Sequence, residues 1–293
     1  MKKSYKYRIY PNKEQREKIS QFFGCSRKMY NLLLDWWISA YKEYKTNGTP
    51  IGSLPQPTFY KKQEEYSYLK DCDAVALATA RINLKSSLDN YFKSKKGKRK
   101  GKKVRFPKFK KKNKSDVKMY FIKNNPKDCI CERHRLKIPT LGWVRIKEKG
   151  YIPTSKDGYV VRSGTISIKA GRYYVSALVE LPDMKVANSN NEGIGIDLGV
   201  KDFAIISNGK TYKNINKSTI LKKIEKQLRR EQRCLSRKYE NLKKGESTQK
   251  NIQKQKLKVQ RLHHKIDNIR TDYINKSIAE IVKTKPSYIT IED

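Results

Sequence analysis

Two carboxylates lie near the ends of strand-like stretches, a position at which proteins often hold metal ions. In GIGIDLGV (193–200), isoleucine and leucine alternate with glycine and Asp197. Side chains of a strand alternate between its two faces, so Asp197 shares its face with glycines. In YITIED (288–293), the same alternation places Glu292 on the face opposite the two isoleucines. Each stretch therefore presents one carboxylate, and Asp197 does so on a face without bulky side chains.

Oxygen ligands from two neighbouring strands suit Mg²⁺ or Mn²⁺. Two such ions about 3.5–4 Å apart stabilise the attacking and leaving oxygens of a phosphodiester. The pattern indicates metal-dependent cleavage of a nucleic-acid backbone, with Asp197 and Glu292 as candidate catalytic and metal-binding residues. The alternative is that both are ordinary polar residues beside turns, and two carboxylates are one fewer than the usual metal-nuclease set.

The net charge also points to nucleic acid. The chain has 68 Lys and Arg against 28 Asp and Glu, a formal charge of +40. Self-repulsion at this density opposes compact folding unless a polyanion neutralises it. A membrane surface is the rival partner, but the sequence has no amphipathic lipid-binding helix, lipidation motif or long apolar run to support it. The N-terminus lacks the apolar stretch of a secretory signal, and the odd number of scattered cysteines suits a reducing compartment. We expect a cytoplasmic, nucleoid-associated protein of a bacterial-type cell.

A basic segment, residues 93–114, is the strongest local expression of this charge. No acidic residue occurs between Asn90 and Ser115, and RFPKF places aromatic rings among the cations. Cations with interleaved aromatics suit backbone contacts and base stacking on RNA or single-stranded DNA. The alternative is a disordered solubilising stretch. The candidate nucleic-acid-binding residues are Lys95, Lys96, Lys98, Arg99, Lys100, Lys102, Lys103, Arg105, Phe106, Lys108, Phe109, Lys110, Lys111 and Lys112.

Helices precede the basic segment. Residues 5–10 alternate like a strand, and Asn12 can cap a helix beginning at Lys13. We expect Gly24 to interrupt this helix before a second one at 26–44. A further helix is expected at 74–92. Its predicted apolar side consists of Val75, Ala78, Ile82, Leu84 and Leu88.

Short strands and then a helical hairpin follow the basic segment. Period-two stretches between 117 and 182 predict a sandwich or barrel, and a polar linker at 183–192 leads to a new domain. That domain begins with the Asp197 strand and a hairpin turning at Asn208-Gly209. Apolar residues then recur every seven positions in 221–242 and in 252–273. The short turn between them favours an antiparallel helical hairpin within one chain, and a dimerising coiled coil is the alternative.

Cysteine and histidine do not form a recognisable zinc pattern. Cys129, Cys131 and His134 lack a second ligand pair, so we interpret them as core or solvated residues and expect no zinc site in this chain. His263 and His264 are interpreted as solvated residues or phosphate contacts on a helix flank.

Five strings in order resemble the transposon-encoded OrfB/TnpB family, whose members are relatives of type V CRISPR nucleases. YKYRIYPNKEQ and FGCSRKMYNLLL resemble the N-terminal region of that family, and KVRFPKFKKK its central segment. GIGIDLGVKDFAIISNGK is similar to the first RuvC motif. LSRK and RLHHKIDNIRTDYINK resemble the stretch between the first two RuvC motifs, and YITIED resembles the second. The resemblance covers the whole chain.

The resemblance implies an α+β multidomain fold. A β-barrel wedge domain (1–11 and 103–182) would be split by a helical recognition insertion (12–102). A partial RNase-H-like (RuvC) α/β domain with a helical hairpin (193–293) would follow. Asp197 and Glu292 would be the first two catalytic carboxylates, while the third carboxylate and a four-cysteine zinc ribbon of the family would lie beyond Asp293.

The expected function is that of a TnpB-like protein, often described as a transposase, with guide RNA and target DNA as partners. In full-length form it would be an RNA-guided, Mg²⁺-dependent DNA endonuclease. The 1–293 chain is expected not to cleave, because the third carboxylate is missing. One alternative is therefore a truncated protein that binds RNA and DNA without cleaving. Another is a basic structural RNA-binding protein, such as a ribosome-associated factor, in which Asp197 has no role.

Overall fold

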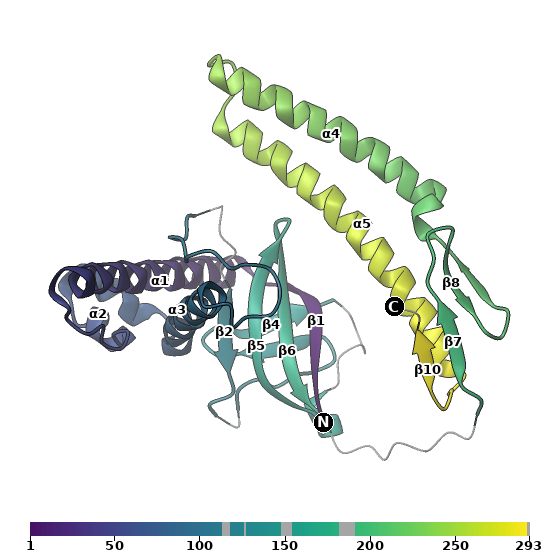
Figure 1. Ribbon diagram of the computed structural model, residues 1–293, viewed down its shortest axis with the longest axis horizontal. Helices are drawn as coiled ribbons and strands as arrows, with labels where there is room; N and C mark the ends of the chain where they lie inside the picture. The colour runs from purple at the N-terminus through teal and green to yellow at the C-terminus, as the bar shows by residue number, and fades with distance from the viewer. Residues whose placement is uncertain (113–117, 126, 148–153, 182–190, 292–293) are drawn as a thin grey trace. The chain divides into compact units, whose positions relative to one another are not determined.

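A computed structural model describes residues 1–112, 118–125, 127–147, 154–181 and 191–291. The chain divides into two compact units, Met1–Met184 and Lys185–Asp293 (Figure 1). Among the described residues, no helix combines the length and the apolar character needed to cross a membrane.

The first unit contains a curled, six-stranded antiparallel sheet in the order β2-β5-β6-β1-β4-β3 (Figure 1). Its strands are β1 (Lys2–Tyr10), β2 (Met119–Ile122), β3 (Arg135–Ile138), β4 (Gly142–Ile146), β5 (Val160–Lys169) and β6 (Arg172–Glu180). The strands expected from the stretches LKIP, WVRIK, GTISIK and RYYVSALVEL are present as β3 to β6, and β2 is an additional strand. The N-terminal strand β1 pairs with β6 on one side and β4 on the other, so the first residues of the chain complete the middle of the sheet.

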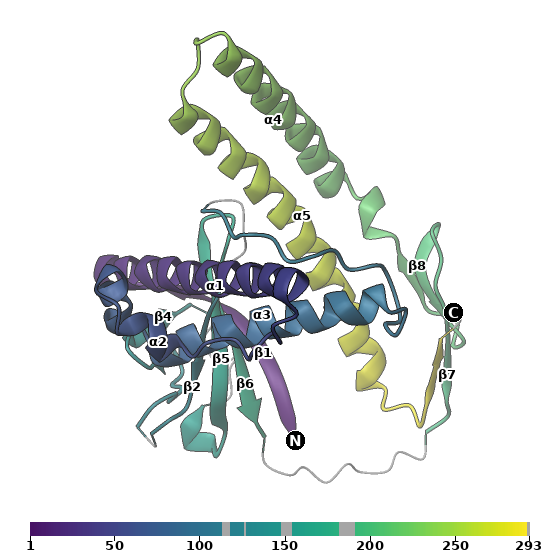
Figure 2. The ribbon, with the colours of Figure 1, turned by 60° about the vertical axis from the view of Figure 1, so that its left-hand side comes forward.

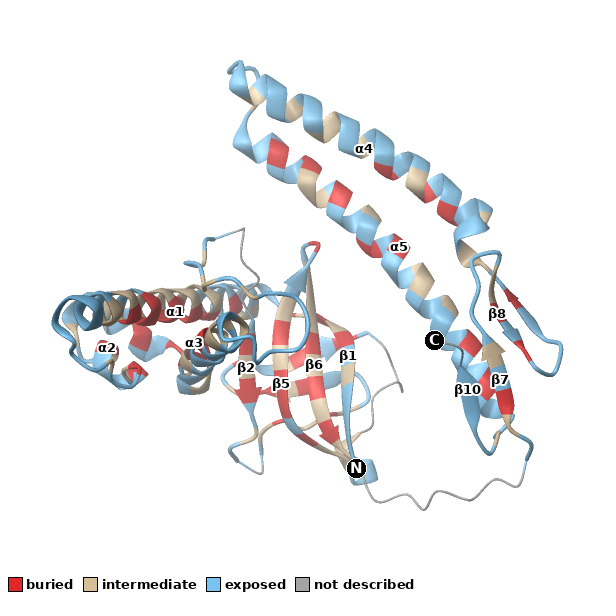
Figure 3. Cartoon of the chain, viewed as in Figure 1, coloured by how far each residue is buried: buried red, intermediate tan, exposed pale blue. Residues whose placement is uncertain are grey.

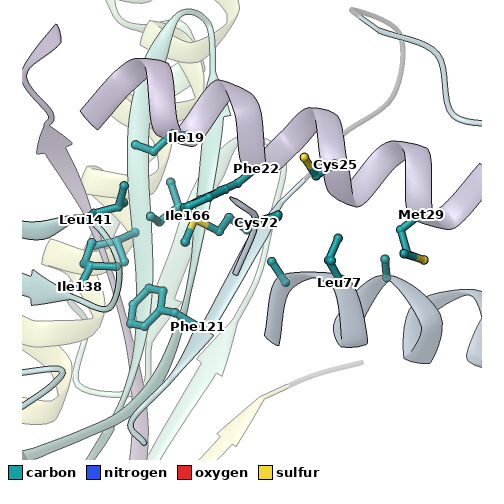
Figure 4. Packing of buried hydrophobic residues seen from close by; sticks show 14 of the residues in the cluster. Ile19, Phe22, Cys25, Met29, Cys72, Leu77, Phe121, Ile138, Leu141 and Ile166 are labelled. Carbon is teal, nitrogen blue, oxygen red and sulfur yellow. The ribbon is translucent and has the colours of Figure 1, made fainter. Parts of the chain in front are cut away.

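The alternation of β1 explains this central position. Tyr7 and Ile9 are buried in the core, whereas Lys6, on the other face, is exposed. A strand with one apolar face gains stability by packing that face against other strands and helices. The main hydrophobic cluster of the first unit contains residues of both the sheet and the helices, including Ile166 and Phe121 on strands and Phe22 on α1 (Figure 4). The segments expected to form a wedge and a separate helical insertion thus share one core.

The helices of the first unit are α1 (Lys13–Asn47), α2 (Pro57–Lys61) and α3 (Ala74–Lys95), with a 3₁₀ helix at Glu64–Asp71. The predicted start of α1 is confirmed by a capping box. The Asn12 side chain accepts a hydrogen bond from the Gln15 backbone N–H at 2.8 Å, and the Gln15 side chain accepts one from the Asn12 N–H at 3.0 Å. The helix ends before Gly48, whose φ of 71° is a left-handed C-cap conformation.

The expected interruption at Gly24 is wrong, because α1 is continuous through that position. A glycine inside a helix costs about 1 kcal/mol relative to alanine. Phe22 and Cys25, on either side of Gly24, are both buried in the core. The packing of this face against the rest of the unit offsets the local cost, so the glycine is tolerated.

The predicted buried side of α3 is only partly correct. Leu84 and Leu88 are buried as expected, but Ile82 is 61% exposed. The other buried residues are Ala76, Leu77 and Ala80. Helices α1 and α3 lie side by side (Figure 2), and Leu77 of α3 faces Met29 of α1 (Figure 4). Contact with α1 therefore selects a stripe displaced from the one that the sequence indicated.

The second unit combines a four-stranded sheet with a helical hairpin. The sheet contains β7 (Ile194–Asp197), β8 (Asp202–Ile206), β9 (Thr211–Lys213) and β10 (Ile289–Ile291), in the order β10-β7-β8-β9. Strand β10 pairs in parallel with β7, while the other pairs are antiparallel. Ile281 near the end of the second hairpin helix packs with Ile194 and Ala204 of the sheet, which joins the two parts.

The expected helical hairpin is confirmed as α4 (Thr219–Lys243) and α5 (Gln249–Lys283). The two apolar stripes meet within the chain, because Leu221 and Leu228 of α4 cluster with Val259 and Ile266 of α5. Buried residues follow the facing sides of both helices, and exposed residues cover the remaining sides (Figure 3).

Candidate metal site and nucleic-acid interface

Asp197 is the last residue of β7 and is exposed. Its strand neighbours have the predicted orientation. Ile194 is buried, and Ile196 packs against the hydrophobic cluster that Ile194 forms with Ala204 and Ile281. Gly195 lies on the face of Asp197, and a Cβ placed there would meet only the Cβ of Ser207, at 3.8 Å. The face is therefore open at Gly195, as that glycine indicated, whereas a Cβ at Gly199 would lie 3.1 Å from the Asp202 carbonyl oxygen.

Hydrogen bonds to β8 and to the β10 side hold this strand in place. The Gly195 N–H donates to the Ser207 Oγ at 3.1 Å, and the Ser207 N–H donates to the Gly195 carbonyl at 2.9 Å. The Ile194 N–H donates to the carbonyl of Tyr288 at 3.0 Å. Ser207 thus fixes Gly195, two residues before Asp197, and no motif in the sequence marked Ser207 for that role.

Strand β10 lies directly against β7 in parallel register. Thr290 pairs with Gly195, and Ile291 pairs with Ile196. The ring of Tyr288 covers Gly193 so closely that a Cβ on that glycine would lie 2.1 Å from the ring. Tyr288 therefore requires glycine at 193. Glu292, the second candidate carboxylate, lies outside the described residues.

Within the described parts of the chain, His, Cys, Asp and Glu residues nowhere gather in a group of three or more that could hold a metal ion. Asp197 contributes carboxylate oxygens, the ligand type that Mg²⁺ and Mn²⁺ prefer. Its chemistry fits such an ion as one member of a larger ligand set.

The basic segment, described from residue 93 to 112, follows α3. Most of its cations are exposed, including Lys98, Arg99 and Lys100. Phe106 instead packs into an aromatic cluster, with its ring centroid 5.6 Å from that of Trp37 and 5.3 Å from that of Tyr91. Phe106 is thus an anchor of the segment, whereas Phe109 is 46% exposed and remains at the surface.

A second anchor holds the segment on α1. The Lys110 backbone N–H donates to the Asn31 Oδ1 at 2.8 Å, and the Asn31 Nδ2 donates to the Lys110 carbonyl at 3.0 Å. The Lys110 ammonium lies 4.0 Å from the centroid of the Tyr30 ring. Burial lowers the pKa of Lys110, because the charged form loses hydration there. Asn31 and Tyr30 have no signal in the sequence, since they are 79 and 80 positions from Lys110 and only the fold brings them together.

Cys129 and Cys131 are buried in the core of the first unit, whereas His134 is exposed. Burial raises the pKa of each thiol to about 11, so both stay protonated at neutral pH. The prediction that His264 is solvated is wrong, because the helical hairpin buries it; His263 is exposed as predicted.

Comparisons with known proteins independently support the family resemblance found in the sequence. A helix-turn-helix domain model of the OrfB IS605 type matches residues 1–46, which here form β1 and most of the single helix α1. The OrfB IS605 model described as "Probable transposase" matches residues 176–293.

Two bacterial relatives match nearly the whole chain. "Putative RNA-guided DNA endonuclease InsQ" of Escherichia coli K12 is 29% identical over 99% of this chain and 65% of its own length. A "Putative RNA-guided DNA endonuclease" of Streptomyces pristinaespiralis is 27% identical over 100% of this chain and 67% of its own length. The chain thus spans about two thirds of the length of these relatives.

A chain in the cryo-EM structure of a Cas12f1–sgRNA–target DNA complex is similar at a TM-score of 0.49 with 15% identity, covering 100% of this chain and 81% of that one. The two family models at opposite ends, and the relatives that match from end to end, show that this chain belongs to the OrfB/IS605 (TnpB) family.

Proposed function

We propose that this chain acts in RNA-guided, Mg²⁺-dependent cleavage of DNA, with guide RNA and target DNA as its partners. The observation that carries the proposal is the parallel pairing of β10 with β7 beside the open face of Asp197. The names of the relatives, putative RNA-guided DNA endonucleases, support the choice of substrate and guide.

Asp197 and Glu292 are the proposed metal-binding and catalytic residues. The register pairs Ile196 with Ile291, and the residues that follow these two in the sequence are Asp197 and Glu292. Bound Mg²⁺ or Mn²⁺ would supply Lewis-acid stabilisation of the charge that develops on phosphate during cleavage. Asp197 would hold the ion through its carboxylate, and the open face at Gly195 leaves room for a nucleic-acid backbone.

The two units take different parts in this function. In the first unit, the curled sheet is the proposed wedge domain, residues 12–102 are the proposed recognition insertion, and the exposed cations of the basic segment contact the nucleic-acid backbone. The second unit is the proposed RuvC-like nuclease domain, with the helical hairpin between its first two catalytic strands.

The test begins with expression of the reading frame from its natural locus, so that neighbouring RNA is produced with the protein. RNA that co-purifies is sequenced, and cleavage of a plasmid carrying a matching target is measured in millimolar Mg²⁺. We expect Asp197→Ala to abolish cleavage and to leave RNA binding unchanged, because Asp197 ligates metal and not phosphate.

Asp272→Ala is the matched carboxylate control. Asp272 is exposed on α5 and pairs with Lys276, one helical turn away, at 2.8 Å. This variant should cut at the wild-type rate. If Asp197→Ala also cuts at the wild-type rate, the proposed nuclease site is wrong.

Binding without cleavage is the second candidate function. It is favoured by the exposed cations of the basic segment, which need no metal ion to bind a phosphate backbone. In that case the same preparation would hold RNA and its DNA target, no Mg²⁺- or Mn²⁺-dependent cut would appear, and Asp197→Ala would change nothing.

A further inference from the structure

The loop that follows Asp197 has little apolar burial to hold it. Residues 198–201, here named the Asp197 loop, connect β7 with β8, and Leu198 and Val200 in it are 52% and 87% exposed. A loop without buried apolar side chains samples several conformations unless hydrogen bonds fix its backbone. Because this loop begins one residue after Asp197, its conformation bears on where the Asp197 carboxylate points.

Two side chains from the turn between β9 and α4 supply such hydrogen bonds. The Asn214 Nδ2 donates to the Val200 carbonyl at 2.8 Å, and the Lys217 Nζ donates to the Lys201 carbonyl at 2.9 Å. The second of these is a charge-assisted hydrogen bond, which is stronger than one between neutral groups. The two carbonyls belong to consecutive residues, so the end of the Asp197 loop is tied to this turn at two successive peptide groups.

Asn214 suits this position because its amide has both a donor and an acceptor. Its Oδ1 accepts a hydrogen bond from the Asn216 backbone N–H at 2.9 Å, which caps the 3₁₀ helix Ile215–Lys217, while its Nδ2 binds the loop. Serine can also cap a helix, but its shorter side chain has no N–H₂ group that could donate to the Val200 carbonyl. The cap and the tie to the loop can therefore be separated by substitution.

The helical hairpin holds the turn from its other side. The Tyr273 hydroxyl of α5 donates to the carbonyl of Lys213, the residue directly before Asn214, at 2.6 Å. The Arg270 Nε of α5 donates to the Asn216 Oδ1 at 2.7 Å. A turn fixed by a long helix positions a neighbouring group more precisely than a free loop does. Hydrogen bonds therefore connect α5, through the turn, to the Asp197 loop.

We propose that Asn214 is a positioning residue for the proposed metal site at Asp197, and that Lys217 is a second one. Both act by holding the Asp197 loop and not by touching the ion, and the inference rests on the proposed function. Mg²⁺ demands near-octahedral geometry, so a ligand that moves binds it less well. Loss of an outer hydrogen bond that orients a metal ligand typically lowers metal affinity or activity by about 10- to 100-fold. Because these two residues act on the loop and not on the carboxylate itself, we expect a loss of about 3- to 10-fold, the effect of one net hydrogen bond.

Two pairs of variants of the full 293-residue chain separate the two ties from other effects. Asn214→Ser keeps a helix-capping side chain and removes the donor to the loop. Its control is Asn208→Ser, at a residue of the β8–β9 turn whose Oδ1 accepts a hydrogen bond from the Lys210 backbone N–H at 3.1 Å. Lys217→Met removes the second donor to the loop and keeps most of the apolar stem, whereas Lys217→Arg keeps both a donor and the charge.

Metal binding is measured directly, by electron paramagnetic resonance of free Mn²⁺ titrated into protein that has been stripped of nucleic acid at high salt. Asp197→Ala identifies the share of the binding that belongs to the site. We expect Asn214→Ser to weaken that share by about 3- to 10-fold relative to Asn208→Ser, and Lys217→Met to bind Mn²⁺ more weakly than Lys217→Arg. In the RNA-loaded preparation, a higher Mg²⁺ concentration should restore cleavage by Asn214→Ser, because this variant lowers the affinity for the ion and not the rate at saturation.

The outcomes distinguish this inference from the proposed function. If Asp197→Ala lowers Mn²⁺ binding and Asn214→Ser binds as tightly as Asn208→Ser, the positioning role is wrong and the metal site is retained. If Asp197→Ala leaves Mn²⁺ binding unchanged, the metal site is wrong and so is the positioning role. If Asn214→Ser fails to fold by circular dichroism, the two Lys217 variants decide, because Lys217 is exposed and its replacement leaves the core intact. Equal Mn²⁺ affinity of Lys217→Met and Lys217→Arg then rejects the proposal.

Discussion

Replacing Asn31 by alanine tests whether the basic segment is held in place before nucleic acid arrives. Asn31 lies on α1 and makes two hydrogen bonds to the backbone of Lys110, at 2.8 and 3.0 Å. Alanine removes both bonds without altering a single charge, and alanine is the residue most favourable in a helix, so α1 itself is not weakened. The change therefore releases one end of the basic segment and leaves the number of its cations unchanged.

The size of the effect follows from these contacts. The net contribution of two hydrogen bonds is roughly 1–3 kcal/mol, and each 1.4 kcal/mol corresponds to a tenfold change in a binding constant. Phe106 still anchors the segment through Trp37 and Tyr91, so the segment is only partly released. We expect RNA affinity to fall by about 5- to 10-fold, because binding must then order residues that are already ordered in the wild type.

The assay is RNA binding over a range of salt concentrations, with Lys108→Gln as the matched comparison. Lys108 is exposed in the same segment, and its replacement removes one charge while leaving the Asn31 anchor intact. Asn31→Ala should lower affinity by the same factor at every salt concentration and leave the slope unchanged. Lys108→Gln should reduce the slope by about 0.7. Wild-type affinity in Asn31→Ala, or a reduced slope in that variant, would refute the idea that the anchor preorganises the segment.

Two further predictions concern other parts of the chain. Gly164→Val should lower the melting temperature of the first unit by several degrees, because a Cβ there lies 2.3 Å from the buried ring of Phe121; overpacking of this kind costs about 1–3 kcal/mol, measurable by thermal denaturation. Stability to urea should fall as the pH rises from about 8.5 toward 11. In this range Cys129 and Cys131 retain their protons in the folded state, while the thiols of the unfolded chain ionise at their ordinary pKa. Equal stability at pH 8 and pH 10.5 would contradict the burial of these thiols.

The sequence was sufficient wherever a structural feature depends on neighbouring residues. Asn12 directly precedes Lys13, so it could be predicted as the cap of a helix beginning there; the structure adds Gln15 as the second half of a capping box. The heptad stripes of 221–242 and 252–273 predicted the hairpin, because a short turn brings both apolar sides together within one chain. The open face beside Asp197 followed in the same way from the two-residue period of its strand.

Other features were decided only by contacts between distant residues. Gly24 favours a break in the helix, but burial of the residues on either side keeps α1 continuous. Ile82 was an acceptable core residue by spacing, and the position of α1 left it exposed. Phe106 was expected to stack on bases, yet its ring packs against Trp37 and Tyr91 and anchors the basic segment. Local sequence determines which elements form and which of their sides are apolar, whereas the choice among nearly equivalent sides depends on the packing partner, and the partner lies tens of residues away along the chain.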